Sequence, residues 1–225
     1  MILGTICARG GSKGVPNKAT RLMLGHSLLW YTFQHAIIEK DVLDSIVISS
    51  DSKDILKEAE GLAKSFSKRN IIIDERPDYL AKDDTSKWDV FRYLSGKYPC
   101  DIMVDLDIGC PLRVPADIRN SVRKLKEGGD VVVTAYESER NPYFNMVLES
   151  GSIVCQSKVI TRRQDAPKVF SLSPSVFAIR QGVLWKVDHW SQADLRIYQI
   201  PRERGIDIDT MDDWNYVEFL MRREP

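Results

Sequence analysis

A short segment after the first apolar run of the sequence is rich in glycine and in positive charge. It contains Arg9, Gly10, Gly11, Ser12, Lys13, Gly14 and Lys18. Glycine readily adopts left-handed backbone angles, so such a loop can turn its N–H groups toward an anion. A triphosphate is the anion that this loop fits best. Neither GxxxxGK[ST] nor GxGxxG occurs in the loop, and a solvated basic turn is the alternative interpretation.

Two acidic pairs offer oxygen ligands of the kind that Mg²⁺ prefers. Asp105 and Asp107 form one pair, and Asp207 and Asp209 the other. Residues two apart share a face of a strand, so each pair is predicted to point one way, and Asp107 to meet Asp209 across a metal ion. The alternatives are that Asp105 caps a helix or pairs with a lysine, and that the second pair is surface charge before a helix.

These residues are positioned by a regular alternation of strands and helices. Apolar runs predict strands at 2–8, 45–50, 70–74, 101–106 and 130–135, and helical spacing predicts helices at 28–40, 53–66, 87–94 and 115–127. The alternation indicates an α/β fold, a mostly parallel twisted sheet with helices on both faces. Ligands of open parallel sheets bind beyond the carboxyl ends of the strands, where the glycine-rich loop is expected.

The pattern changes after Tyr136. Short alternating pieces at 146–149 and 152–154, separated by a glycine turn, predict a hairpin within an inserted lobe at about 137–174. Strands at 176–179 and 195–200, a short helix at 183–187, and a helix after Thr210 follow. Asp213, three residues after Thr210, fits a capping box. The chain is therefore expected to be a single domain, 1–225, that carries one inserted lobe.

Composition narrows the function classes. The 225 residues are 43% hydrophobic and 28% charged, which argues against intrinsic disorder. Lys plus Arg and Asp plus Glu both total 32, so no excess of positive charge favours nucleic acid. No apolar run approaches the roughly 20 residues that a membrane helix needs. Dispersed cysteines favour a cytoplasmic protein with free thiols: Cys7, Cys100, Cys110 and Cys155.

Five segments together resemble the acylneuraminate cytidylyltransferases, the family of the CMP-sialic acid and CMP-nonulosonic acid synthetases. They are the loop at 8–18, residues 76–86, Pro111-Leu112-Arg113, residues 163–170 and the Ile206–Thr210 segment. The resemblance covers nearly the whole chain and implies a Rossmann-like nucleotidyltransferase fold. Residues 141–145 and 162–169 look closer to the branch that handles legionaminic-type acids.

The resemblance also implies roles for individual residues. The phosphates of CTP are expected at Arg9 and Lys18, with Gly10, Gly11, Ser12 and Lys13 beside them, and the rest of the nucleotide near Arg76, Ser86 and Asp107. Mg²⁺ is expected at Asp207 and Asp209, with Asp107. The acceptor acid is expected at Arg163, Gln164 and Phe170, and the lobe at 137–174 is expected to form a homodimer. Arg9, Lys18 and Asp209 are the residues expected to be catalytic.

The sequence departs from the family pattern at several positions. Ala19 stands where an Asn is common, residues 107–110 differ from the usual segment, Lys87 stands at a serine position and Phe144 at a lysine position. Two alternatives therefore stay open. One is a CTP-dependent nucleotidyltransferase for another acid or a sugar phosphate, and the other is a non-catalytic nucleotide-binding homologue.

Overall fold

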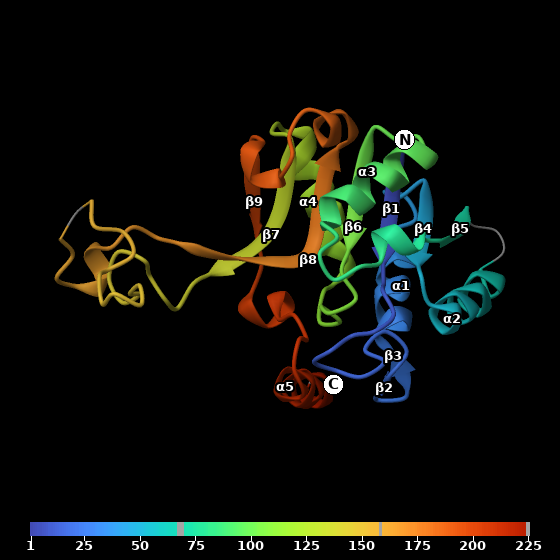
Figure 1. Cartoon of the computed structure of the whole chain (residues 1–225), viewed down its shortest axis with the longest axis horizontal. Coiled ribbons are helices and arrows are strands. Elements are labelled where there is room, and N and C mark those ends of the chain that lie inside the picture. The colour runs from blue at the N-terminus through green and yellow to red at the C-terminus, as the bar shows by residue number, and fades with distance from the viewer. Residues whose placement is uncertain (67–69, 158, 224–225) are drawn as a thin grey trace.

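The computed structural model describes residues 1–66, 70–157 and 159–223 and contains a seven-stranded sheet (Figure 1). The strand order is β5-β4-β1-β6-β8-β7-β9, and only β8 runs antiparallel to its neighbours. The strands are β1 (Ile2–Cys7), β4 (Ser45–Ser50), β5 (Ile71–Glu75), β6 (Ile102–Leu106), β7 (Val131–Glu137), β8 (Phe170–Arg180) and β9 (Leu195–Gln199). The predicted mostly parallel α/β fold is confirmed.

Among the described residues, five α-helices connect or follow these strands. They are α1 (Leu28–Ile38), α2 (Lys53–Lys64), α3 (Lys87–Lys97), α4 (Pro115–Lys126) and α5 (Met211–Arg223). The Ser27 hydroxyl caps α1 by accepting a hydrogen bond from the Trp30 amide at 2.9 Å, an interaction typically worth about 1 kcal/mol. At the start of α5, Thr210 and Asp213 hydrogen-bond each other's amides. Both predicted caps are confirmed.

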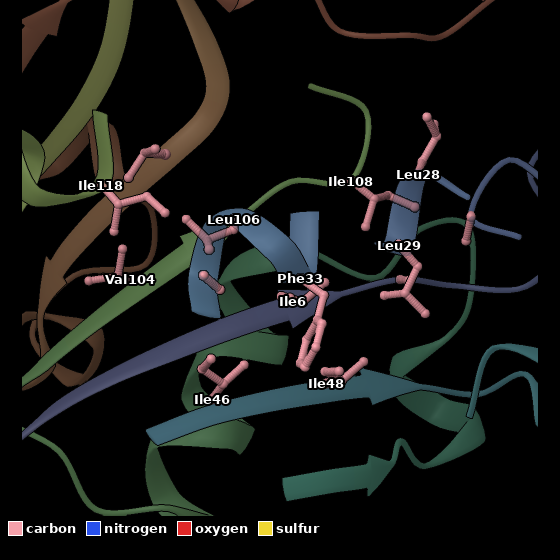
Figure 2. Close-up of a cluster of buried hydrophobic side chains, with 14 of the residues drawn as sticks. Ile6, Leu28, Leu29, Phe33, Ile46, Ile48, Val104, Leu106, Ile108 and Ile118 are labelled. Atoms are coloured by element: carbon pink, nitrogen blue, oxygen red, sulfur yellow. The ribbon is translucent and has the colours of Figure 1, made fainter. Parts of the chain in front are cut away.

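The alternation of side chains along the strands builds a core on each face of the sheet. One face packs against α1, α2 and α4 through Ile6, Ile48 and Val104 (Figure 2). The opposite face packs against α3 through residues such as Leu3 and Met103. Because both faces are covered, the strands are apolar nearly throughout, as expected for parallel strands.

The predicted lobe is an extended arm that leaves the sheet after β7 and returns along β8 (Figure 1). The expected hairpin within it is reduced to one antiparallel bridge between Val147 and Ile153, with Gly151 in the turn at φ +82°. Residue 158 of the predicted lobe lies outside the described residues. The strand expected at 176–179 is longer, because it starts at Phe170 and pairs with β7 toward the arm.

The sheet changes its direction of growth at β1. The chain passes from β1 to β4 and β5 on one side and then to β6 on the other. The crevice at such a switch point, beyond the carboxyl ends of the strands, is the usual ligand site of this architecture. The loops after β1 and β6 lie there. The small hairpin of β2 (Leu22–Met23) and β3 (His26–Ser27) and helix α5 lie at the same end of the sheet (Figure 1).

Candidate functional site

A cavity of about 460 Å³ opens beyond the carboxyl ends of β1 and β6. Four stretches of the chain line it: residues 7–18, 76–90, 107–108 and Asp209. Seven of the residues predicted to bind the nucleotide, its phosphates or a metal ion are therefore brought together: Arg9, Ser12, Lys13, Lys18, Arg76, Asp107 and Asp209.

The glycine-rich loop lies directly against the segment before α5. The Lys18 ammonium donates a hydrogen bond to the Ile208 carbonyl at 2.7 Å and lies 3.5 Å from an Asp209 carboxylate oxygen. A Cβ at Gly14 would lie 1.9 Å from the Asp209 carbonyl oxygen. Only glycine therefore permits this approach, which brings two segments 190 residues apart in sequence to one side of the cavity.

Asp83 holds two cations of the loop at the mouth of the cavity. Its carboxylate lies 2.8 Å from Arg9 Nη1 and 2.6 Å from Lys13 Nζ. Hydrogen bonding and charge from Lys13, and then from Arg9, lower the pKa of Asp83. All three side chains are at least 42% exposed, so an incoming polyphosphate can exchange with the carboxylate at little cost.

The first turn of the loop is held by the residue that follows β4. The Gly10 amide donates to Asp51 Oδ1 at 2.9 Å, and Gly11 takes the left-handed conformation at φ +68°. The Gly10 amide is therefore engaged by a carboxylate. Neither glycine is among the residues that line the cavity.

Arg76 and Ser86, both expected near the nucleotide, have structural partners. Arg76 is buried, and its guanidinium donates to the carbonyls of Ala8 and Ser49, which ties the ends of β1 and β4 together. Ser86 caps α3 by accepting from the Trp88 amide at 3.1 Å. Arg76 lines the cavity. Around the start of α3, Thr85 and Lys87 line it as well, but Ser86 does not.

Asp105 and Asp107 point the same way, as predicted, and share one lysine. Lys87 Nζ lies 2.7 Å from an oxygen of each carboxylate. Burial alone would lower the pKa of Lys87, but the two carboxylates raise it well above its usual value. Burial would raise the pKa of Asp107, but Lys87 and the Gly109 amide lower it to about 2. The lysine pairing considered for Asp105 is confirmed.

The Asp207–Asp209 pair does not share a face, because residues 206–210 form no strand. Asp209 is largely exposed beside Lys18. Asp207 turns inward, and its Oδ1 is buried without a hydrogen-bond partner among the described residues. That oxygen lies 1.9 Å from where a Cβ at Gly109 would be. Burial, and then the charge of Asp107, raise the pKa of Asp207 to about 7.

These acidic groups fit a magnesium ion that is shared with a ligand. Within residues 1–66, 70–157 and 159–223, no cluster of three or more His, Cys, Asp or Glu side chains could hold a metal ion alone. Magnesium needs only one or two carboxylates, however, when phosphate oxygens and waters complete its shell. Asp207 is not among the residues that line the cavity, but its unpartnered oxygen lies in the negative field of Asp107 and would attract a cation.

The residues expected to bind the acceptor lie on the arm, apart from the cavity. Arg163 and Gln164 are exposed in a short 3-10 helix, and Phe170 starts β8. The neighbouring Arg162 makes two hydrogen bonds to Asp165, whereas Arg163 has no ion pair within the described part of the chain. None of the three predicted acceptor residues lines the cavity.

Three important residues had no role assigned from the sequence. Asp83 lies within the segment 76–86 that resembles the family, and Lys87 directly follows it. A motif shows neither that a carboxylate holds the loop cations nor that a lysine bridges two aspartates. Gly109 is missed because its significance depends on Asp207, almost 100 residues later. The available signal was the departure at Lys87, where a charge replaces a hydroxyl.

Comparisons with known proteins identify the family of the chain. The cytidylyltransferase family model matches residues 3–199. The chain belongs to the cytidylyltransferase family. It is therefore a nucleotidyltransferase, and the family resemblance read from the motifs is confirmed. None of the helices in the described ranges is long and apolar enough to cross a membrane.

Two relatives align over nearly the full length of both proteins. The "CMP-N,N'-diacetyllegionaminic acid synthase" of Campylobacter jejuni is 34% identical, over 98% of this chain and 94% of the relative. "Post-translational flagellin modification protein B" of Campylobacter coli is 31% identical, over 99% and 96%. An N-acylneuraminate cytidylyltransferase of Streptococcus agalactiae is 26% identical, over 94% of this chain and 51% of its own length.

Solved structures with low sequence identity share the fold. A CMP:2-keto-3-deoxy-manno-octonic acid synthetase complexed with CTP has a TM-score of 0.73 at 14% identity and covers 100% of this chain and 99% of its own. A 4-diphosphocytidyl-2C-methyl-D-erythritol synthase from Anaerococcus prevotii has a TM-score of 0.71 at 16% identity, over 99% and 96% of the two chains.

Proposed function

We propose that this cytidylyltransferase activates a nonulosonic acid of the sialic-acid type, with a legionaminic-type acid as the favoured acceptor. The products would be the CMP-sugar and pyrophosphate. The observation that carries the proposal is the contact of Lys18 with the Ile208–Asp209 segment, which puts a cationic loop and an acidic segment on one cavity. The names of the full-length relatives support the choice of acceptor.

The loop cations would bind the triphosphate and stabilise the leaving group. The anomeric hydroxyl oxygen of the acid attacks the α-phosphorus of CTP, and the bond to the bridging oxygen of pyrophosphate breaks. Negative charge builds up on that oxygen, so Arg9, Lys13 and Lys18 would act electrostatically. Asp83 holds Arg9 and Lys13 before the nucleotide enters, and the triphosphate would replace it.

Magnesium is the cofactor that we propose for this site. Asp207 and Asp209, with Asp107 adjacent, would hold the ion, and Asp209 pairs with Lys18 of the loop. When bound, Mg²⁺ would neutralise phosphate charge and acidify the attacking hydroxyl. The chain's own contribution is the position of Asp207, which Gly109 permits by having no side chain.

The acceptor site would be completed by a second copy of the chain. Arg163 is exposed on the arm and separate from the cavity of its own chain, and its planar guanidinium suits a carboxylate. The arm also exposes apolar side chains: Met146, Val147, Leu148, Val154 and Val159. We therefore propose a homodimer in which the arm of one protomer covers the cavity of the other.

The free cysteines of the chain fit an enzyme of the reducing cytoplasm.

The direct test is pyrophosphate release measured over a panel of nucleotides and acids. Our proposal predicts turnover with CTP and Mg²⁺ and with nine-carbon nonulosonic acids, fastest with the legionaminic type. If CTP were consumed only in the presence of an eight-carbon acid or a sugar phosphate, the result would favour a CTP-dependent nucleotidyltransferase for another acceptor. CTP binding without turnover on any acceptor would favour a non-catalytic homologue, and either result would refute our assignment.

A further inference from the structure

Lys87 occupies a position between two carboxylates where a cation is required. Asp105 is completely buried and Asp107 is mostly buried, and each has one oxygen 2.7 Å from Lys87 Nζ. The Lys87 side chain is 37% exposed and lines the cavity. This group is therefore within reach of a bound ligand, as is Asp107, which also lines the cavity, whereas Asp105 is buried and does not line it.

The second oxygen of each carboxylate is fixed by a different local group. Thr5 Oγ1 donates to Asp105 Oδ1 at 2.9 Å, and the Gly109 amide donates to Asp107 Oδ1 at 2.9 Å. These bonds aim the two Oδ2 atoms at one point. Each of these two oxygens lies 2.7 Å from Lys87 Nζ, so a divalent cation in the place of the ammonium, with ligand distances of about 2.1 Å, would require each carboxylate to move toward it.

The location of Lys87 in α3 shows that the two carboxylates, and not the helix, stabilise a positive charge at this position. It is the first residue of α3, where the N-terminal end of the helix dipole disfavours a cation by about 0.3–1 kcal/mol. Ser86 caps the helix, and Trp88 and Phe91 pack α3 onto the sheet. The ammonium is thus held between Asp105 and Asp107 by a well-anchored helix.

We infer that Lys87 is a built-in cation that fills the divalent-metal position between Asp105 and Asp107, leaving Asp207 as the carboxylate that recruits a metal ion. The inference deepens the proposed function, on which it rests in taking this cavity as the nucleotide site. As a consequence, the chain binds one divalent ion fewer than it would if residue 87 carried no positive charge. Lys87 also contributes a permanent positive charge to the nucleotide cavity.

The test counts Mn²⁺ ions bound per chain by electron paramagnetic resonance, with no nucleotide present. Lys87→Ser is expected to bind one Mn²⁺ more than the wild type, and Lys87→Arg the same number as the wild type. The double variant Lys87→Ser with Asp105→Asn is expected to lose the additional ion. Equal numbers for Lys87→Ser and the wild type would overturn the inference.

Thermal unfolding supplies a second readout with a matched control. Lys97 pairs with the buried Asp74 at 2.7 Å, at the opposite end of α3. Both Lys87→Ser and Lys97→Ser should lower Tm, because each leaves buried negative charge uncompensated. Mn²⁺ should raise the Tm of Lys87→Ser by several degrees through binding to the folded state, with no such effect on Lys97→Ser. Equal responses of the two variants would contradict a metal position.

Crystals of the wild-type protein decide the matter if Lys87→Ser does not fold. After soaking with Mn²⁺ and CTP, anomalous density is expected at Asp207 and is not expected between Asp105 and Asp107. An anomalous peak between those two residues would overturn the inference. None of these readouts requires turnover, so a failure of the nucleotide and acid panel would be distinguished from a failure of the Lys87 assignment.

Discussion

The cavity and the arm are built in opposite ways. The cavity lies at the ends of central strands, and its groups are fixed by contacts with distant parts of the chain, such as Lys18 with Ile208 and Lys87 with Asp105. The arm is held by local contacts, including one bridge between Val147 and Ile153, and exposes most of its side chains. The difference is the basis of our proposal that one chain is sufficient to form the nucleotide site, whereas the acceptor site would need a surface from another copy.

The largest effect should come from Lys18, which joins the two halves of the cavity. Lys18→Met removes the ammonium that contacts Ile208 and Asp209. We expect kcat/KM for CTP to fall about 10²- to 10³-fold, the usual cost of losing one group that stabilises a transition-state charge. Steady-state pyrophosphate release measures it, with the exposed Lys40→Met as control. A change smaller than about fivefold would separate Lys18 from the chemistry.

Gly109 tests whether the position of Asp207 matters. In Gly109→Ala the new Cβ would lie 1.9 Å from Asp207 Oδ1 and displace it. Displacement of a reacting group by about 1 Å can cost about 10²-fold, so we expect a loss of that order, with a higher Mg²⁺ requirement. Gly182→Ala, which meets nothing within 4 Å, is the control. Unchanged magnesium dependence in Gly109→Ala would remove Asp207 from the metal site.

Arg163 tests the arm separately from the cavity. Arg163→Ala should raise KM for the acid about 10- to 100-fold, the effect of losing one charge-assisted hydrogen bond, while KM for CTP stays the same. Arg162→Ala is the control, because Arg162 is already engaged by Asp165. A parallel rise in KM for CTP would mean that the acceptor site is misplaced.

A mixture of Lys18→Met and Arg163→Ala chains sharpens this result. If the arm of one protomer completes the cavity of the other, half of the randomly formed dimers are mixed and each has one intact site. Activity should then recover to about one quarter of the wild-type value, as dimer symmetry dictates. Recovery no greater than the sum of the two variants alone would show that each chain uses its own arm.

The smallest effect concerns the core beneath the cavity. Burial, and then the charge of Arg113, lower the pKa of His35 to about 3. Below pH 6.5 the unfolded chain therefore binds a proton at His35 that the folded chain does not, and folding stability decreases. Between pH 7 and pH 5 the wild type should lose about 2 kcal/mol more than His35→Leu. Urea unfolding at both pH values measures this difference, and equal losses would contradict a buried neutral His35.

The arrangement of strands and helices could be predicted from the sequence because apolar periodicity is local. The direction of β8 could not, since a strand at 176–179 reads the same whether it pairs parallel or antiparallel with β6. The predicted shared face of Asp207 and Asp209 is wrong, because the alternation rule holds only in strands and residues 206–210 form none.

The site residues that belong to a sequence motif could be predicted. Contacts between residues that are distant in sequence could not. The loop at 9–18 and Asp107 line one cavity, as expected. Ser86 was expected near the nucleotide but caps α3, and whether it also touches ligand stays a prediction. The bridge from Lys87 to Asp105 and Asp107 depends on the packing of α3 against β6, which no local pattern in the sequence encodes.

The central claim is that the loop at 9–18 and the acidic segment at 207–209 act on one triphosphate. A crystal structure with CTP and Mg²⁺ tests it most directly. We predict that the phosphates contact Arg9 and Lys18, that the ion lies against Asp207, and that Asp83 has released the loop cations. A triphosphate bound on the arm, or at the opposite ends of the strands beside Arg119 and Arg123, would contradict the account.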